Sequence, residues 1–422
     1  MKGSRSLPEG RFARFTRLAA LGAQTSVSLL TSKDAKAAAT NAAEVLGNLR
    51  GLAAKVGQMA SYVDGAVPEA YRGPYEAALR SLRASTQASS PDAIRRTVEE
   101  DLGAPIGTLF AEWEPEPFAS ASIGQVHRAR LDDGRWVAVK VQHPGSDRAV
   151  ESDVRNAGML ETMLGSVLPR AVYTKRIFNE VRDRFREELD YRKESENHRR
   201  FARIHAGDTC IVIPEVIESR SARRVITTEL VSGTPLEAVS GLTEAERQSY
   251  ATTLWRFEFT SLLRHGLFNA DPHPGNFLFQ PGGQIAFLDF GCVQYLDGSM
   301  QHAANRVHES ALQRDETAFS CAVAHMLQTR GGSFERAAVN YVRLCFQPIF
   351  ESPFRITSQY VRSVVAGVRP LKSELFAKDK SFVMPPPGWA FMNRLQFGFF
   401  SVLSKLDVAV DYAQIERQLL RG

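Results

Sequence analysis

The sequence has few of the features that mark disulfide-rich, zinc-stabilised or membrane-spanning proteins. Only four of its 422 residues are cysteines, and none forms a CxxC pair or stands beside a histidine cluster. This scarcity argues against a disulfide framework and structural zinc, and it favours a reducing, cytoplasmic location. The apolar stretch 395–404 is bounded by Arg394 and Lys405, far short of the roughly 20 residues that a membrane-spanning helix needs. We therefore expect a soluble chain.

The chain also lacks a strong charge of either sign. Its net charge is +5, without a lysine tract, so nucleic-acid binding is not indicated. Near the N-terminus, basic residues and the apolar side chains Phe12, Phe15 and Leu18 lead into an uncharged run at 18–32 that is too short and polar to span a bilayer. The plainer interpretation of this stretch is a helix that packs on its own protein, and peripheral membrane contact is the alternative.

The periodicity of the apolar residues divides the chain into three parts. Residues 41–63 repeat apolar side chains at helical spacing in an alanine-rich background, so we expect 1–103 to be a helical N-terminal extension. Short β-branched segments favour a small antiparallel sheet within 104–230. Helical patterns dominate 231–422, which should form a helical lobe.

Turn and cap signals place several of these elements more closely. The expected strands of the sheet cover residues 118–131, 136–142, 211–216 and 224–230. Residues 132–134 should turn the first two strands into a hairpin, and apolar residues four apart predict one long amphipathic helix over 174–201. In the helical lobe, Thr243 and Glu246 have capping-box spacing, and only 284–289 should interrupt the helices as a strand.

A loop of small residues followed by a lysine strand is the first sign of nucleotide chemistry. Gly124 and Val126 occupy the last positions of the GxGxxGxV pattern that covers the phosphates in kinases, and Ala119 and Ala121 replace its first two glycines. An alanine Cβ limits how closely the backbone approaches phosphate, so this loop should bind nucleotide differently. Lys140 has the spacing of the lysine that pairs the α- and β-phosphates. Taken alone, such a run is more often a structural hairpin.

The strongest signal is a DPHPGN motif that begins at Asp271 and is followed by a DFG motif that begins at Asp289. Kinases hold magnesium with the catalytic-loop Asn and the DFG Asp, and an Asp five residues before that Asn accepts or orients the substrate's proton. Asp271 and Asn276 keep this offset, which predicts Asp271 as the catalytic residue and Asn276 and Asp289 as metal ligands. The usual His-Arg before the catalytic Asp is Asn269-Ala270 here, so the surrounding hydrogen bonds should differ from those of ordinary protein kinases.

A helix rich in carboxylates completes the pattern. Glu187, Glu188, Asp190 and Glu194 would normally indicate a solvated charged face. A kinase-like fold, however, needs a helix after the lysine strand that supplies a glutamate to orient the lysine, and this is the only helix available. We expect Glu194 to pair with Lys140. The residues expected around the nucleotide are Ala119, Ser120, Ala121, Ser122, Ile123, Gly124, Val126, Lys140, Glu194, Glu229 and Val231.

Together these residues resemble the UbiB family of atypical kinases, also called the AarF or ADCK family. All four family signatures are present: KxGQ at 55–58, which alone would mean little, SIGQVH at 122–127, ExD at 188–190 and DPHPGN at 271–276. The resemblance covers nearly the whole chain, from about residue 14 past the DFG strand.

The resemblance implies an α+β, protein-kinase-like two-lobed fold that binds ATP or ADP with Mg²⁺. In such a protein the N-terminal extension folds over the substrate side and brings Lys55 and Gln58 towards Glu188 and Asp190, all four with catalytic roles. The family is linked to isoprenoid quinone (ubiquinone) biosynthesis and lipid homeostasis, which implies an ATPase or a phosphotransferase acting on a small lipid-like molecule. Ser120 departs from the usual alanine run, and the C-terminal membrane hairpin of many bacterial members is not found.

Two other functions fit the same residues. An ordinary protein kinase should carry an APE-like motif after the DFG segment, and the sequence after Gly291 has none. A nucleotide-gated binding module without turnover would use the same residues to switch a conformation, and the sequence leaves that possibility open.

Overall fold

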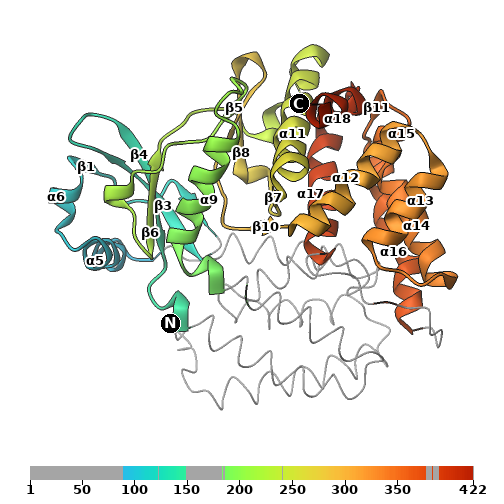
Figure 1. Cartoon of the computed structure of the whole chain (residues 1–422). Helices are drawn as coiled ribbons and strands as arrows, with labels where there is room; N and C mark the ends of the chain where they lie inside the picture. The colour runs from blue at the N-terminus through green and yellow to red at the C-terminus, as the bar shows by residue number, and fades with distance from the viewer. Residues whose placement is uncertain are drawn as a thin grey trace, which may run out of the picture. The chain divides into compact units, whose positions relative to one another are not determined.

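The computed structural model describes residues 89–148 except Ser122, residue 183, residues 186–376 except Ser240, residue 383 and residues 389–421. The chain divides into two compact units, and nearly all the described residues belong to the unit formed by Ser89–Pro144 and Leu168–Gly422. Within this unit, a small antiparallel sheet and a mainly helical part form a kinase-like fold (Figure 1).

The first part of this unit is built on a twisted antiparallel sheet. Its strands are β1 (Glu112–Trp113), β2 (Ala119–Ser120), β3 (Gly124–Arg130), β4 (Trp136–Gln142) and β6 (Val225–Glu229), in the order β1-β3-β4-β6 with β2 paired to β3. The predicted hairpin joins β3 to β4, and Gly134 supplies the positive φ of +87° that its turn requires. In β4, Val137, Val139 and Val141 are fully buried on one face. Because side chains alternate along a strand, Lys140 faces the other side of the sheet.

The buried valine face of β4 is covered by a helix. α5 (Pro91–Leu102) begins at Ser90, whose side chain accepts a hydrogen bond from the Ala93 amide, and ends at Gly103 with φ +72°. Its Ile94 and Val98 share one core with the valines of β4 and with the short helix α6 (Ile106–Leu109). α5 thus lies within the stretch 1–103 that was expected to be helical, and it packs on the sheet.

The third expected strand is divided between two sheets. Within 211–216, only Ile211–Val212 (β5) is a strand, and it pairs in parallel with β9 (Gln284–Phe287), which also pairs with β8 (Phe277–Gln280). Val216 forms an antiparallel bridge to Thr228 of β6, with backbone hydrogen bonds on either side of it. The prediction that 211–216 joins the antiparallel sheet is thus correct only at the end of the segment, because the parallel partner of β5 lies far along the chain and leaves no local signal in the sequence.

The long helix expected over 174–201 is interrupted in its described part. Residues 186–188 are helical, but Leu189 and Asp190 are not, and a new helix, α9 (Tyr191–Ile204), starts with Asp190 as its N-cap. The Asp190 side chain accepts a hydrogen bond from the Arg192 amide and thereby satisfies a donor at the start of α9. Side-chain capping of this kind competes with helix continuation, which explains the break.

The helical part is organised around α11 (Glu244–His265). The predicted capping box is confirmed, with Thr243 and Glu246 each accepting from the other's main chain, and α11 ends at Gly266 with φ +63°. The other helices are α10 (Leu236–Val239), α12 (Gly298–Leu312), α13 (Glu316–Met326), α14 (Gly332–Cys345), α15 (Gln347–Phe350), α16 (Ser358–Phe376), α17 (Trp389–Leu406) and α18 (Tyr412–Arg421). α11 packs against α17 and α18, as Figure 1 shows.

Strands are more numerous among the helices than the sequence predicted. Besides β8 and β9, β7 (Leu267–Asn269) pairs with β10 (Val293–Tyr295), and β11 (Phe354–Arg355) pairs with β12 (Ala409–Val410). The prediction of one strand at 284–289 is thus incomplete, because strands of two to four residues carry too little periodicity to recognise. The pair β7–β10 lies next to the expected site, since the loop with Asp271 follows β7 and the segment with Asp289 precedes β10.

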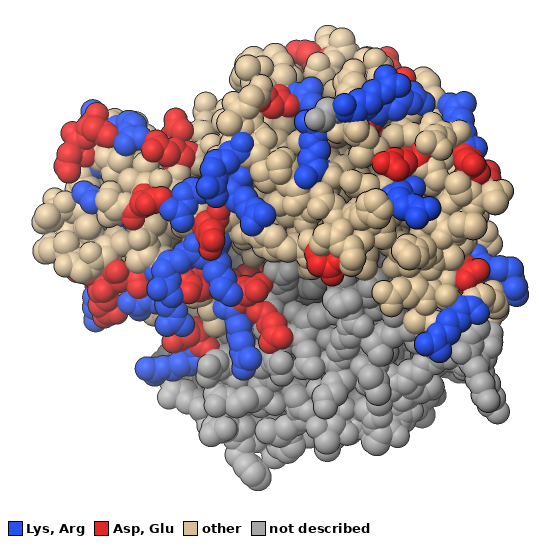
Figure 2. All heavy atoms as spheres, in the orientation of Figure 1, with Lys and Arg blue, Asp and Glu red and all other residues tan. Residues whose placement is uncertain are grey.

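The described surface mixes charges of both signs. Figure 2 shows Lys and Arg side chains interspersed with Asp and Glu on the face in view, in keeping with the small net charge. Among the helices that the structure describes, none has both the length and the apolarity needed to cross a membrane. The apolar stretch 395–404 lies inside α17.

Candidate functional site

A half-buried lysine connects the sheet to the helical part of this unit. Lys140 Nζ of β4 donates to both oxygens of Glu194 in α9, at 2.8 and 3.0 Å, and to Oδ2 of Asp289 at 2.9 Å. The Glu194 side chain is only 6% exposed and that of Lys140 17% exposed, whereas Asp289 is 30% exposed. Glu194 is thus the carboxylate next to Lys140, as the sequence predicted, and Asp289 is the member of the trio that solvent reaches most.

The electrostatics of the trio keep the lysine charged. Burial lowers the pKa of Lys140, but the carboxylates of Asp289 and Glu194 outweigh it and hold the pKa above its ordinary value. Burial raises the pKa of Glu194 to about 7, although Lys140 lowers it. The Tyr191 ring lies 5.1 Å from Lys140 Nζ, within cation–π range. Lys140 is therefore held as an ammonium ion, the form that attracts phosphate oxygens.

The loop after β7 is tied to the DFG segment by one amide. Asn269 Nδ2 donates to the Asp289 carbonyl at 2.8 Å, and Asn269 Oδ1 accepts from the Asp271 amide at 3.1 Å. Asn269 therefore links the backbone of Asp271, the expected catalytic residue, to the backbone of Asp289, an expected metal ligand. Asn269 was not among the site residues expected from the sequence. Its only signal there is that it stands where other kinases have the His of His-Arg-Asp.

The two expected metal ligands present oxygen donors that suit a hard cation. Asn276 Nδ2 donates to the Asp271 carbonyl at 2.9 Å, so the carbonyl oxygen of the same amide is the atom that can coordinate a metal. Asp289 Oδ1 accepts from the Gly291 amide at 2.8 Å, which orients the carboxylate. One carboxylate and one amide oxygen, completed by phosphate oxygens and water, is a ligand set typical of Mg²⁺ in nucleotide sites.

The DFG segment is also anchored to α9. Phe290 is fully buried and packs against His198 and Phe201, with ring centroids 4.4 and 4.8 Å away. His198 Nε2 donates to the Leu288 carbonyl at 3.2 Å, and Asn197 Nδ2 donates to the Phe290 carbonyl at 2.9 Å. Burial lowers the pKa of His198 to about 4, so its ring stays neutral at pH 7. These α9 residues were missed from the sequence, although His198 lies one helical turn after Glu194.

The alanine-rich loop forms the tight turn between β2 and β3. Ala119 pairs with Val126 and Ser120 with Gln125, and the Ala121 amide donates to the Gly124 carbonyl at 2.9 Å. A Cβ on Gly124 would lie 2.3 Å from the carbonyl oxygen of Val141, so this glycine is required by the close approach of β4. Ile123 is buried, and Ser122 lies outside the described residues.

The remaining expected site residues are only partly described. Asp190 accepts from Arg192 at 2.6 and 2.8 Å, and this pairing lowers the pKa of Asp190. Glu188 is half-buried in the helical residues before the break. Glu229 is exposed at the end of β6, and Val231, two residues later, is half-buried. Lys55 and Gln58 lie outside the described residues, so their expected approach to Glu188 and Asp190 stays a prediction.

The fold and the lysine–carboxylate geometry define a kinase-like protein. A family described as the ABC1 atypical kinase-like domain matches residues 81–322, which is more than half of the chain. The chain therefore belongs to this family, which is the UbiB or ADCK family of atypical kinases.

Similar proteins of this family come from several organisms. The chain is 34% identical over 232 residues to the Arabidopsis thaliana chloroplastic protein ACTIVITY OF BC1 COMPLEX KINASE 3, covering 52% of this chain and 32% of that protein. It is 28% identical over 369 residues to the Danio rerio mitochondrial atypical kinase COQ8B, covering 85% of this chain and 57% of that protein. The matches thus span less than two thirds of these curated relatives. A solved structure of Rv3197 from Mycobacterium tuberculosis in complex with erythromycin has a TM-score of 0.63 at 27% identity, covering 95% of this chain and 97% of that one.

Proposed function

We propose that this protein binds ATP with Mg²⁺ and either hydrolyses it or transfers its terminal phosphoryl group to a small, lipid-like acceptor. The observation that carries the proposal is the contact of Lys140 with both Glu194 and Asp289, because this contact brings the lysine strand, α9 and the DFG segment into one site. The family's link to isoprenoid quinone biosynthesis supports an acceptor related to that pathway. Peripheral contact with a membrane belongs to the same proposal.

Each residue has a role that follows from its chemistry. Lys140 neutralises phosphate charge and is kept charged and oriented by Glu194. Asp289 and the Asn276 carbonyl would hold Mg²⁺, which when bound balances the charge on the phosphates. Asp271 orients the attacking hydroxyl or water and accepts its proton as the bond from the terminal phosphorus to the leaving ADP oxygen breaks. The loop from Ala119 to Gly124 covers the phosphates.

Part of the proposed acceptor site lies outside the described residues. The KxGQ residues Lys55 and Gln58 are proposed to line the substrate side together with Glu188 and Asp190. An N-terminal extension in that place would obstruct a peptide substrate, which favours a small acceptor over a protein. The division into an extension at 1–103, a sheet lobe at 104–230 and a helical lobe at 231–422 is part of this proposal.

The test is a direct measurement of binding and turnover with the full chain. Calorimetric titration with ATP, in the presence and absence of Mg²⁺, should show Mg²⁺-dependent affinity. Phosphate release should then be measured with and without a phenolic lipid. Binding without phosphate release or product labelling would favour a nucleotide-gated binding module, and absence of binding would contradict the proposal. Incubation of cell extract with labelled ATP and the protein would identify the acceptor by its labelled product.

A further inference from the structure

A carboxylic acid lies buried between α11 and the loop that carries Asp271. Glu258, in the middle of α11, is 3% exposed. Its Oε1 has no hydrogen-bond partner in the part of the chain that the structure describes. Leaving a polar atom unpaired in the interior costs free energy, and an apolar side chain at this position would avoid that cost. The carboxyl therefore needs an explanation other than packing.

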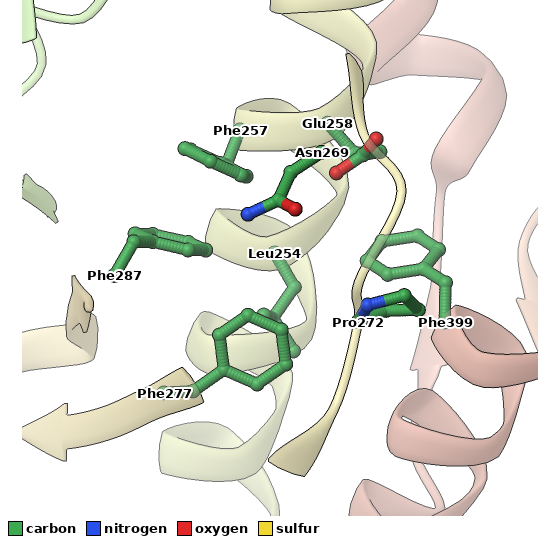
Figure 3. Close-up of a pocket in the computed structure, with 8 residues that line it drawn as sticks. All are labelled: Leu254, Phe257, Glu258, Asn269, Pro272, Phe277, Phe287 and Phe399. Carbon is green, nitrogen blue, oxygen red and sulfur yellow. The ribbon is translucent and has the colours of Figure 1, made fainter. Parts of the chain in front are cut away.

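The surroundings of Glu258 are almost entirely apolar. It lines a narrow pocket between α11, β8, β9 and α17, and Figure 3 shows its side chain next to Asn269, with Phe399 lying beside Pro272. The other lining residues are Leu254, Phe257, Phe277 and Phe287. A charged carboxylate is poorly solvated in such a place, and burial raises the pKa of Glu258 well above its ordinary value. The group thus favours its neutral, protonated form.

A backbone group of the catalytic loop acts on the Glu258 carboxyl. Glu258 and Asn269 line the same pocket, and the backbone N–H of Asn269, as a donor towards the carboxyl, lowers the pKa of Glu258 against the larger effect of burial. The side chain of the same Asn269 holds the Asp271 amide and the Asp289 carbonyl, at 3.1 and 2.8 Å. Glu258 thus lies against the residue whose side chain is hydrogen-bonded to the expected catalytic residue and to one expected metal ligand.

We propose that Glu258 is a positioning residue that holds the backbone of Asn269 from the side of α11. By doing so it sets the separation of Asp271 and Asp289 for magnesium-dependent nucleotide chemistry. This inference rests on the proposed function and adds to it a residue that touches neither nucleotide nor metal. A neutral acid suits the task, because its carbonyl oxygen accepts the Asn269 N–H without placing a negative charge behind the metal ligands.

The test compares three variants of the full chain. Glu258→Leu removes the acceptor and fills the apolar pocket, Glu258→Gln keeps a carbonyl acceptor in the same shape, and Leu254→Ala loosens the same pocket without touching the loop's hydrogen bonds. The readouts are ATP affinity with and without Mg²⁺, turnover, thermal unfolding and hydrogen exchange of the Asn269 segment.

The expected result separates positioning from mere stability. Glu258→Leu should reduce the Mg²⁺-dependent gain in ATP affinity, and turnover, by about tenfold or more, the usual effect of losing a group that orients a metal ligand. Its affinity for ATP without Mg²⁺ should change little, and hydrogen exchange around Asn269 should accelerate. Glu258→Gln should restore both properties. Leu254→Ala should lower the unfolding temperature through the cavity it leaves, with the Mg²⁺ gain unchanged.

Three results would overturn the inference. A Glu258→Leu protein with the parent's Mg²⁺ gain would show that the loop does not depend on this contact. Loss of the gain in Glu258→Gln would show that the acid does more than accept a hydrogen bond, and this variant decides the matter if Glu258→Leu does not fold. Equal loss in Leu254→Ala would show that any disturbance of the pocket has the same effect. A parent protein without Mg²⁺-dependent ATP affinity would contradict the proposed function itself, and this inference with it.

Discussion

Lys140 and Asp289 are 149 positions apart in the sequence, and their side chains meet at 2.9 Å. The contact with Lys140 adds to another one, since the other carboxylate oxygen of Asp289 accepts from the Gly291 amide. Asp289 is thereby held beside the ammonium group before any metal is added. A ligand oriented in advance loses less conformational freedom on binding, so this contact should contribute to nucleotide affinity.

Asp289→Asn should weaken magnesium-dependent ATP binding at least about tenfold, or about 1.4 kcal/mol, because an amide replaces the only carboxylate of the proposed ligand pair. Calorimetric titration at fixed Mg²⁺ measures the change. Asp132→Asn is the control, because Asp132 lies on the exposed β3–β4 turn, away from the site. Equal affinities of parent and Asp289→Asn would refute the assignment of Asp289 as a metal ligand.

Gly398→Ala should disturb the catalytic loop from α17. A Cβ at this position would lie 2.5 Å from Cγ of Pro272, the residue after Asp271, so α17 or the loop must move. Displacement of a catalytic group by about 1 Å can cost about 100-fold in rate, and we expect turnover to fall by at least about tenfold. Gly298→Ala in α12 is the matched control, since its new Cβ meets no atom within 4 Å. Parent-like turnover in Gly398→Ala would show that α17 does not constrain the loop.

Acidification should destabilise the protein partly through His198. Burial lowers its pKa to about 4, whereas an exposed histidine in the unfolded chain titrates at about 6.5. The unfolded state therefore binds the extra proton first, so the contribution of His198 to stability is present above pH 6.5 and is lost as the pH falls towards 4. Between pH 7.5 and 5.5 this loss is about 1.4 kcal/mol by the same linkage.

The measurement is the free energy of unfolding in urea at the two pH values, for the parent and for His198→Gln. Glutamine can still donate to the Leu288 carbonyl but does not titrate, so the drop between the two pH values should shrink by about 1.4 kcal/mol. His205, whose pKa burial also lowers to about 4, is present in both proteins and cancels. An identical drop in both proteins would mean that His198 does not stay neutral in the folded state.

Lys55→Ala and Glu188→Gln should be coupled if the KxGQ segment closes over the site. A lysine in a partly dehydrated cleft requires an opposite charge, and the family pattern offers Glu188 and Asp190. The double-mutant cycle on ATP affinity and turnover should deviate from additivity by more than about 0.5 kcal/mol. Protease sensitivity of residues 41–64 should increase in Lys55→Ala without global unfolding. Additive effects in every assay would refute the proposed closure.

Features that depend on residue type and short spacing could be predicted from the sequence. The Thr243–Glu246 capping box, the β3–β4 hairpin and the offset of Asp271 and Asn276 all follow from contacts within a few residues, where side-chain chemistry leaves few alternatives. The pairing of Lys140 with Glu194 is long-range. It was predictable because the kinase-like pattern identified both the lysine strand and the helix.

The contacts between distant segments and the burial of polar groups could not be predicted from the sequence and follow from the folded arrangement. The parallel pairing of β5 with β9, the bridge that Asn269 makes between Asp271 and Asp289, and the burial of Glu258 have no local signature. Glu258 illustrates the reason. In the sequence it is an ordinary helical glutamate, and its pKa is raised only because α17 and the strands β8 and β9 exclude water around it. Burial is a property of the assembled fold, so its effect on the pKa of a side chain cannot be predicted from the local sequence.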